Sequence, residues 1–312
     1  MTSQRQRRLV CVGSVVIDIV MHVPRLPDPG GDVVAPTSRL TVGGAFNVMS
    51  AASRQGLSVT YASGHGTGPL GNMVRSQLAV MGIEMTSPAT PAIDTGFSVT
   101  FVTADGERTF ATAPGAEAIS TQETLDAVPI FPGDLVYVSG YGLAYRDSGP
   151  VLARWVSQLD AHILVVVDPG PLVAAIPDVV LRAVAARCNW WSCNEREARL
   201  MTGAVSPDQA VRRLIEITGR DGVLVRLGRN GCLLLMRGRD VQHLRARAVE
   251  VVDTTGAGDT HTGTFMAALV HGAEPSEAVH IANVAASIAV SRPGSPTAPT
   301  PEELRRSLAR EA

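Results

Sequence analysis

Two aspartates and two glycines lie close together in the segment Val251–Gly263, VVDTTGAGDTHTG, where an apolar strand is followed by a helix. The small residues Gly256, Ala257 and Gly258 leave the first N–H groups of that helix accessible, and the helix dipole favours an anion beside them. A carboxylate such as Asp259 would compete with an anion for those donors unless it has a task of its own. Asp259 is therefore either a general base or a carboxylate that compensates the helix dipole, and the segment alone favours neither.

A second glycine cluster, GTGPLG at residues 66–71, matches the G-x-G-x-x-G pattern of dinucleotide-binding folds. Such a fold has an acidic residue at the end of the next strand, about 20 residues further on, whereas this chain has the proline-interrupted PATPAIDTG. The dinucleotide interpretation is therefore weak. The sequence also has no G-x-x-x-x-G-K-[ST] pattern, which excludes a Walker-type nucleotide loop.

Three further groups of polar residues stand in apolar surroundings: Asp18 at the end of the first predicted strand, GGAFN at residues 43–47 and NEREA at residues 194–198. Polar residues at the carboxyl ends of parallel strands face a common ligand crevice, so we expect these groups to converge. Taken singly, each has a structural alternative. Asp18 and Asn47 are also typical turn or cap residues, and Glu197 also suits a solvated helix face.

The elements that must hold these residues alternate between apolar, β-branched runs such as ILVVVDP and VLVRLG and segments with helical periodicity such as PDQAVRRLIEIT. This alternation predicts a doubly wound, mostly parallel α/β sheet with helices on both faces. Two regions, at about 21–42 and 97–112, instead have the pattern of short strands and turns, including a hairpin centred on Asp105 and Gly106. We therefore predict a single domain over residues 1–312 with a small β-rich lid inserted at these two places.

The composition limits the class of protein. The 312 residues are 45% hydrophobic and 18% charged, and 27 basic residues against 29 acidic ones give a formal net charge of -2. This balance argues against a nucleic-acid-binding protein, and no apolar run is long enough to span a membrane. Asp18 interrupts the apolar run after the basic N-terminus, so we expect no signal peptide and a cytoplasmic location. The four cysteines lack the spacing of a zinc site, which indicates buried, reduced thiols.

Together these motifs resemble those of the ribokinase-like (PfkB) carbohydrate kinase family, in the same order over nearly the whole chain. GSVVID resembles the family's first strand with its substrate-binding aspartate, and GGAFNVMSAASRQG resembles its N-terminal glycine-pair signature. GTGPLGNMVRSQLAVMGI resembles a segment that usually contains glycine, aspartate and phenylalanine, NEREA the Asn-x-x-Glu motif, and RLGRNG the nucleotide-loop strand. DTTGAGDTHTG resembles the C-terminal signature, which is highly specific.

The resemblance implies an ATP- and Mg2+-dependent kinase that phosphorylates a hydroxyl group of a small sugar. Asp259 corresponds to the family's catalytic base, and Gly256, Ala257 and Gly258 correspond to its anion hole. The other correspondences are substrate contacts at Asp18, Gly43, Gly44 and Asn47; Mg2+ and phosphate binding, largely through water, at Asn194 and Glu197; nucleotide binding at Arg226, Gly228, Gly231 and Asn283; and a K+ site at Asp253, Thr255, Arg292, Gly294 and Thr297.

The sequence departs from the family pattern at positions that concern the substrate. Only two residues separate the glycine pair from Asn47, where the family usually has three, so Gly43 and Gly44 are both candidates for the substrate contact. Val16 stands where ribokinase has a polar residue, which argues against ribose. The identity of the sugar therefore stays open.

Two other functions and one assembly are also open. A nucleoside kinase of the same family is an alternative if Phe46, Phe97 or Tyr141 stacks on a base. A non-catalytic sugar- or nucleotide-binding regulatory member is a second alternative, although Asp259 argues against it because a binder needs no base. Exposed lid strands also predict pairing across a two-fold axis, and hence a homodimer.

Overall fold

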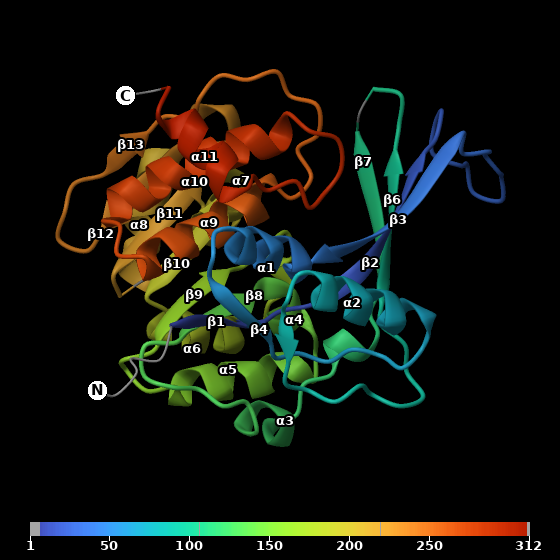
Figure 1. Cartoon of the computed structure of the whole chain (residues 1–312), viewed down its shortest axis with the longest axis horizontal. Coiled ribbons are helices and arrows are strands. Elements are labelled where there is room, and N and C mark those ends of the chain that lie inside the picture. The colour runs from blue at the N-terminus through green and yellow to red at the C-terminus, as the bar shows by residue number, and fades with distance from the viewer. Residues whose placement is uncertain (1–6, 106, 219, 311–312) are drawn as a thin grey trace.

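The computed structural model describes residues 7–105, 107–218 and 220–310 and contains two β-sheets (Figure 1). Within this described part, the larger sheet has nine strands, which are parallel from β5 to β11 and antiparallel at the β12–β13 edge. This arrangement confirms the predicted, mostly parallel α/β class. In spatial order the strands are β13 (Gln242–Leu244), β12 (Cys232–Met236), β11 (Gly222–Arg226), β10 (Trp190–Asn194), β9 (Leu164–Asp168), β8 (Leu135–Ser139), β1 (Arg8–Val12), β4 (Ser58–Tyr61) and β5 (Glu84–Met85).

Helices cover both faces of the large sheet (Figure 1), which explains why its central strands are apolar on both sides. In β1, Leu9 belongs to the core beneath α1, α2, α9 and α10, whereas Val10 belongs to the core beneath α3, α5, α6 and α8. The helices are α1 (Ala45–Arg54), α2 (Pro69–Val80), α3 (Gln122–Asp126), α4 (Gly140–Ala144), α5 (Ser148–Gln158), α6 (Asp178–Arg187), α7 (Glu195–Thr202), α8 (Pro207–Ile217), α9 (Ala257–Val270), α10 (Pro275–Val290) and α11 (Pro301–Leu308).

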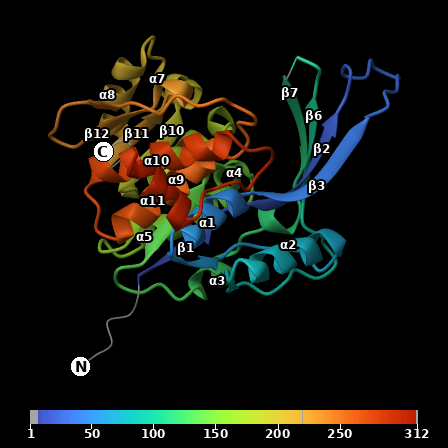
Figure 2. The ribbon, with the colours of Figure 1, turned by 45° about the horizontal axis from the view of Figure 1, so that its top comes forward.

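A second, smaller sheet projects from the main body (Figure 2) and has the strand order β3-β2-β6-β7 among the described residues. We call these four strands the small sheet. Its strands β2 and β6 pair in parallel, and β3 and β7 pair with them in antiparallel. Gly106, in the turn of the expected hairpin, lies outside the described residues. The strands are β2 (Val15–His22), β3 (Thr37–Gly44), β6 (Phe97–Val102) and β7 (Arg108–Ala113).

The position of Asp18 corrects one prediction from the sequence. Asp18 does not end the first strand, because β1 stops at Val12 and the chain then leaves the large sheet. Strand β2 begins at Val15, earlier than the expected lid boundary near residue 21, and Asp18 lies in its middle, opposite Thr41 of β3. The apolar run LVCVGSVVID therefore contains two strands of different sheets rather than one.

The strand order reverses between β1 and β8, because β4 and β5 extend the sheet on one side of β1 and β8 to β13 extend it on the other. In such sheets a ligand crevice forms outside the carboxyl ends of the strands at this reversal. Ser139, Asp168, Asn194 and Arg226 end β8, β9, β10 and β11 and therefore lie along one edge. The start of α9 and the small sheet face the same edge (Figure 1).

The sequence predicted buried thiols and no membrane-spanning segment. The four cysteines are buried in the two cores, in agreement with the predicted buried thiols. Among the residues that the structure describes, no helix combines the length and the apolar character needed to cross a bilayer.

Candidate active site

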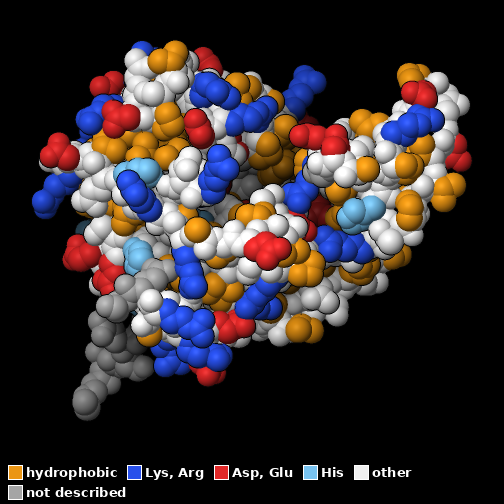
Figure 3. All heavy atoms as spheres, turned by 90° about the horizontal axis from the view of Figure 1, so that it is seen from above, with side chains coloured by type: hydrophobic (Ala, Val, Ile, Leu, Met, Phe, Trp, Pro, Cys, Tyr) orange, Lys and Arg blue, Asp and Glu red, His pale blue; other side chains and the backbone are white. Residues whose placement is uncertain are grey.

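A cavity of about 260 Å³ lies between the small sheet, the strand ends of the large sheet and the start of α9. Figure 3 shows the surface hollowed between the main body and the projecting small sheet. Of the predicted site residues, those that line the cavity are Asp18, Gly44, Asn47, Glu197, Arg226, Thr255, Gly256, Ala257, Gly258 and Asp259. The small sheet contributes Ser98, Phe110 and Thr112 to the opposite wall.

Asp259 lies in the first turn of α9 at the floor of this cavity. Its Oδ2 accepts a hydrogen bond of 3.2 Å from Nδ2 of Asn47. Burial and the nearby negative charge of Asp168 raise the pKa of Asp259 to about 7, against the opposing effects of Asn47 and Arg226. A carboxyl with such a pKa can accept a proton near neutral pH, as a general base must.

The backbone around Gly256 forms the start of α9. Gly256 has a left-handed conformation with φ 73°, and no side chain of the N-cap residue accepts a hydrogen bond from the first turn. The N–H of Ala257 points to the carbonyl of Thr254 at 3.3 Å. The following N–H groups, of Gly258 and Asp259, belong to the first turn, where no intrahelical acceptor exists. They and the helix dipole can bind an anion in the cavity.

Arg226 ends β11 inside a buried group of acidic and hydroxyl side chains. Its guanidinium lies 3.0 Å from Oδ2 of Asp168 and 3.8 Å from Oε2 of Glu197, and it also donates to Ser192 and Thr262. Asp168 was not predicted as a site residue. The signal was present, because the run ILVVVD ends in this carboxylate and the carboxyl ends of parallel strands face the crevice.

Asn194 and Glu197 form a capping box at the start of α7. The N–H and side-chain amide of Asn194 each donate to Glu197 at 2.8 Å, and the N–H of Glu197 donates to Oδ1 of Asn194 at 2.8 Å. Glu197 is 3% exposed, so the alternative of a solvated helix face is wrong. Burial and the charge of Asp168 raise its pKa, and Arg226 opposes this shift.

These two residues fit Mg2+ only in an indirect way. Both carboxylate oxygens of Glu197 already accept hydrogen bonds from Asn194, and no cluster of three metal-ligating side chains occurs among the described residues. Mg2+ in nucleotide sites usually keeps several waters and is bound mainly by the phosphates, with one or two carboxylates nearby. Glu197 and Asn194 therefore fit a role in holding such an ion through water.

The substrate-contact candidates Asp18, Gly43 and Gly44 lie where β2 and β3 enter the cavity. Burial raises the pKa of Asp18 to about 6, and the positive charge of Arg39 opposes this shift. Gly43 packs against the Asp18 carboxylate so closely that a Cβ there would lie 1.9 Å from Oδ2. Gly44, at the start of α1, lines the cavity and Gly43 does not. Gly43 therefore leaves room for Asp18, and Gly44 faces the ligand space.

The residues expected to bind the nucleotide do not all line one space. Asn194, Gly228 and Arg226 line a shallow groove that adjoins the cavity at Arg226. Gly231 ends the short helical turn after β11, with φ 90°. Asn283 is buried on α10 and its Nδ2 donates to the carbonyl of Leu244 at 2.9 Å, so it lines neither space.

Of the residues expected to bind K+, Asp253, Arg292 and Thr297 have side chains that are already engaged in hydrogen bonds or ion pairs. Asp253 accepts hydrogen bonds from Thr255 and Gly294 and pairs with two arginines of the small sheet. Arg292 pairs with Glu303 at 2.7 Å and reaches the carbonyl of Thr297 at 3.4 Å. The hydroxyl of Thr297 donates to the carbonyl of Ala289 at 3.1 Å.

The aromatic residues that could stack on a nucleoside base differ in position: Phe46 and Phe97 pack with the core, and Tyr141 lines the cavity. Phe46 is 2% exposed within the core, and Phe97 packs against the same core. Tyr141 lines the cavity, together with Tyr145 and Phe110. Only one of the three residues considered from the sequence is therefore in a position to stack on a ligand.

Comparisons with known proteins identify the family and the fold. Residues 6–303 match the family described as pfkB family carbohydrate kinase. The uncharacterized sugar kinase YegV of Escherichia coli K12 is 31% identical over 307 residues, which cover 96% of this chain and 93% of that protein. Two solved structures share the fold. The structure of Arabidopsis thaliana ribokinase complexed with ribose and ATP has a TM-score of 0.79 and 24% identity, and the match covers 97% of this chain and 99% of that one. The structure of Methanocaldococcus jannaschii nucleoside kinase has a TM-score of 0.81 and 20% identity, with 98% of this chain and 99% of that one covered.

Proposed function

Because the chain belongs to the pfkB family of carbohydrate kinases, we propose that it transfers the terminal phosphoryl group of ATP to a hydroxyl group of a small, uncharged sugar, with Asp259 as the general base. One observation carries the proposal. Asp259 lies at the floor of the cavity, beside the first N–H groups of α9, and its pKa is raised to about 7. A base and an anion site thus adjoin the same reacting position, as phosphoryl transfer requires.

In the proposed reaction the substrate hydroxyl loses its proton to Asp259 as its oxygen forms a bond to the γ-phosphorus and the bond to ADP breaks. The N–H groups of Gly258 and Asp259 and the α9 dipole stabilise charge on the transferring group. Asn47 holds the Asp259 carboxylate in position. Mg2+ bound to ATP would neutralise the triphosphate, with Asn194 and Glu197 holding it through water. The small sheet covers the cavity and excludes water, which would otherwise accept the phosphoryl group.

The charges around the cavity support an uncharged sugar. Among the described residues that line it are four carboxyl side chains, of Asp18, Asp168, Glu197 and Asp259, and one basic side chain, Arg226. Arg226 is already paired with two of those carboxylates. Sugar acids and sugar phosphates would therefore meet like charges without a cation to bind them, whereas Asp18 can accept hydrogen bonds from neutral hydroxyl groups.

A nucleoside is the second candidate acceptor, and the observation that favours it is the aromatic wall formed by Phe110, Tyr141 and Tyr145. Phe110 is 62% exposed, which leaves its ring accessible to a base. These rings also suit the apolar face of a sugar, so the two acceptors are separated by experiment.

The test is an ADP-release screen with ATP and Mg2+ over neutral monosaccharides, sugar acids, sugar phosphates and nucleosides. We expect turnover with neutral sugars and at least tenfold lower kcat/KM for charged ones. Turnover restricted to nucleosides would support the second candidate. ADP release that is equal in the wild type and in Asp259→Asn would contradict the catalytic role of Asp259, and calorimetric binding of ATP and sugar without any turnover would indicate a binding protein.

A further inference from the structure

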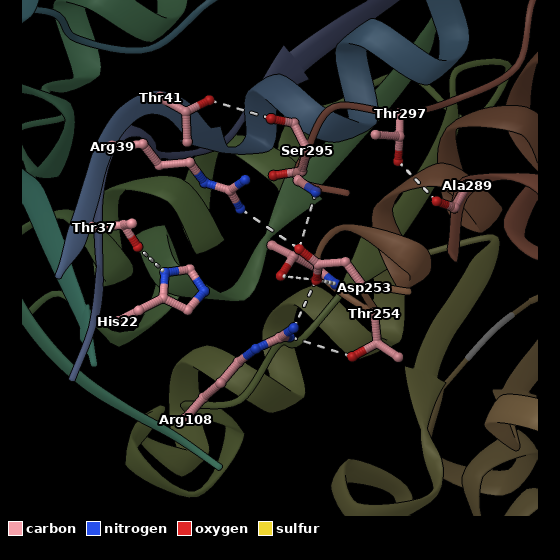
Figure 4. A network of polar contacts seen from close by, with 12 residues as sticks. His22, Thr37, Arg39, Thr41, Arg108, Asp253, Thr254, Ala289, Ser295 and Thr297 are labelled. Atoms are coloured by element: carbon pink, nitrogen blue, oxygen red, sulfur yellow. Dashed lines mark hydrogen bonds and ion pairs between the residues drawn. The ribbon is translucent and has the colours of Figure 1, made fainter. Parts of the chain in front are cut away.

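Asp253 links two loops at the base of α9. Its Oδ1 accepts the N–H of Thr255 at 2.9 Å and the hydroxyl of Thr255 at 2.7 Å, and its Oδ2 accepts the N–H of Gly294 at 3.0 Å (Figure 4). Thr255 immediately precedes Gly256, the N-cap of α9. The orientation of Asp253 therefore fixes the backbone from which the proposed anion hole begins.

Two arginines of the small sheet form ion pairs with the same carboxylate. Arg108, the first residue of β7, lies 2.6 Å from Oδ1 and also donates to the hydroxyl of Thr254 at 3.3 Å. Arg39 of β3 lies 3.5 Å from Oδ2. Figure 4 shows both side chains extending from the small sheet toward Asp253. We call these three residues, Arg39, Arg108 and Asp253, the clasp.

A third contact joins the small sheet to the second loop. The hydroxyl of Thr41, two residues after Arg39 on β3, donates to the carbonyl of Ser295 at 3.2 Å (Figure 4). Arg39 itself packs on Gly294, where a Cβ would lie 2.9 Å from its Nη1. The small sheet therefore contacts both loops that support the start of α9, and it does so through side chains of two different strands.

The surroundings of Asp253 do not fit the monovalent cation that the sequence resemblance implied. A carboxylate offers about four lone-pair positions. Asp253 already accepts hydrogen bonds from two donors of Thr255 and from the N–H of Gly294, and it pairs with two guanidinium groups. The carbonyl oxygens of Ala289, Ser295 and Thr297 accept hydrogen bonds from side chains. Each of these three carbonyl oxygens thus already has one donor, and the positive charge beside Asp253 comes from the two arginines.

The clasp is suited to opening as well as closing. The side chain of Asp253 is 15% exposed, whereas those of Arg108 and Arg39 are 28% and 41% exposed. Burial alone would raise the pKa of Asp253, but hydrogen bonds from Thr255 and Gly294 and the charge of Arg108 lower it to about 2, so the carboxylate is charged at any physiological pH. Partly exposed ion pairs are individually weak and are screened by salt. The two ion pairs of Asp253 with Arg39 and Arg108 can therefore favour the closed position of the small sheet and still allow it to open.

We propose that Arg39 and Arg108 are positioning residues that close the small sheet onto the catalytic loop through Asp253 and that supply the positive charge there, so that phosphoryl transfer needs no added K+. This inference rests on the proposed kinase reaction for its kinetic part only. The contact between the small sheet and the loops can be measured without any substrate.

The substrate-independent experiment is backbone hydrogen–deuterium exchange on the wild type, on Arg39→Ala/Arg108→Ala and on Asp253→Asn. We expect both variants to exchange at least several-fold faster in β3, β7 and residues 253–257, with unchanged exchange in the core strands β8 and β9. The matched control is Arg25→Ala. Arg25 lies in the connection between β2 and β3, outside the clasp, and pairs with the nearby Asp28 at 2.7 Å. Unchanged exchange in both variants would contradict the proposed contact between the small sheet and residues 253–257, whether or not a substrate is known.

The kinetic experiment compares K+, Na+ and choline salts at one ionic strength. We expect wild-type kcat to agree within about twofold in all three salts. The double alanine variant should lose at least tenfold in kcat with a smaller change in sugar KM, and guanidinium ion or the Arg39→Lys/Arg108→Lys exchange should restore part of it. A wild type that K+ activates fivefold or more, or a double alanine variant with normal kcat, would overturn the catalytic part of the inference. If no acceptor is phosphorylated, the exchange experiment still decides the contact.

Discussion

The loops before α2 and α9 both place small residues at a helix N-terminus, yet they use the exposed N–H groups differently. Before α2, the Asp94 carboxylate accepts the N–H groups of Leu70 at 3.0 Å and Gly71 at 2.8 Å. Gly68 allows this approach, since a Cβ there would lie 2.4 Å from the carboxylate. Before α9, the N-cap is Gly256, no comparable side chain caps the first turn, and the loop opens into the cavity.

The difference explains why one glycine pattern is structural and the other is the candidate site. A helix N-terminus attracts any anion, and the α2 end is filled by a carboxylate of the same chain, Asp94, so it has no need of a ligand. The α9 end carries Asp259, whose carboxylate is held by Asn47 rather than by the N–H groups of the first turn. Its donors are therefore left for a ligand.

Asp259→Asn is expected to have the largest effect. It removes the proposed base but keeps the side-chain shape, so kcat should fall by roughly 100-fold or more while sugar KM changes only a few-fold. Thermal stability should stay the same or rise, because the variant removes a buried charge. Steady-state kinetics and a melting curve check this. Near-normal kcat would make the α9 loop, like the α2 loop, a structural feature.

Asp18→Asn tests the wall opposite the α9 loop. If Asp18 binds a sugar hydroxyl equally in the ground and transition states, its replacement should raise KM by about tenfold with little change in kcat, because a hydrogen bond to a charged group contributes about 1.5–3 kcal/mol. The same kinetic assay measures it. A fall in kcat at unchanged KM would mean that Asp18, not only Asp259, acts in the chemical step.

The pH dependence should separate the two loops. The pKa of Asp259 is raised to about 7, so kcat/KM should increase about tenfold from pH 6 to pH 8 as the base loses its proton. Below pH 6 the slope should steepen because the pKa of Asp18 is raised to about 6. A flat rate profile from pH 6 to pH 8 would remove the base assignment.

The stabilisation of the loop before α2 by Asp94 should depend on pH only in the acidic range, below the usual pKa of an aspartate. Burial raises the pKa of Asp94, but hydrogen bonds from the backbone N–H groups of the α2 loop outweigh burial and lower it. Its stabilising effect is therefore complete above the usual pKa of an aspartate and is lost only as the pH falls below that range. From pH 6 to pH 8 the stabilisation by Asp94 should accordingly be complete and constant, so Asp94 should cause no pH-dependent change in the melting temperature over this range.

Asp94→Ala is expected to have the smallest kinetic effect. It leaves the α2 N–H groups without their acceptor, which should lower the free energy of unfolding by about 1–2 kcal/mol, a typical cost for losing a helix cap. kcat and KM should stay within twofold of the wild type. Chemical denaturation together with kinetics provides the check. A large loss of activity at normal stability would show that the α2 loop has a direct part in catalysis.

Much of the candidate site could be predicted because its residues occur in contiguous motifs. GGAFN and GAGD contain Asn47 and Asp259, and the structure joins them by a hydrogen bond of 3.2 Å. Asp168 was missed although it ends a predicted strand, because no second motif residue lies beside it. The position of Asp18 was misassigned because periodicity cannot distinguish one long strand from two strands separated by Gly13 and Ser14.

The sequence by itself determined the α/β class, the helix that begins near Gly256 and the presence of a carboxylate in its first turn, because these follow from local periodicity and from residue types a few positions apart. Only the tertiary structure decided which carboxylate or cation meets each loop. Asp94 reaches the α2 loop from 23 and 24 residues away, and Arg108 reaches Asp253 across 145 residues. Such partners depend on how the two sheets pack, since a local pattern fixes the direction of free N–H and carboxylate groups but not the distant side chain that satisfies them.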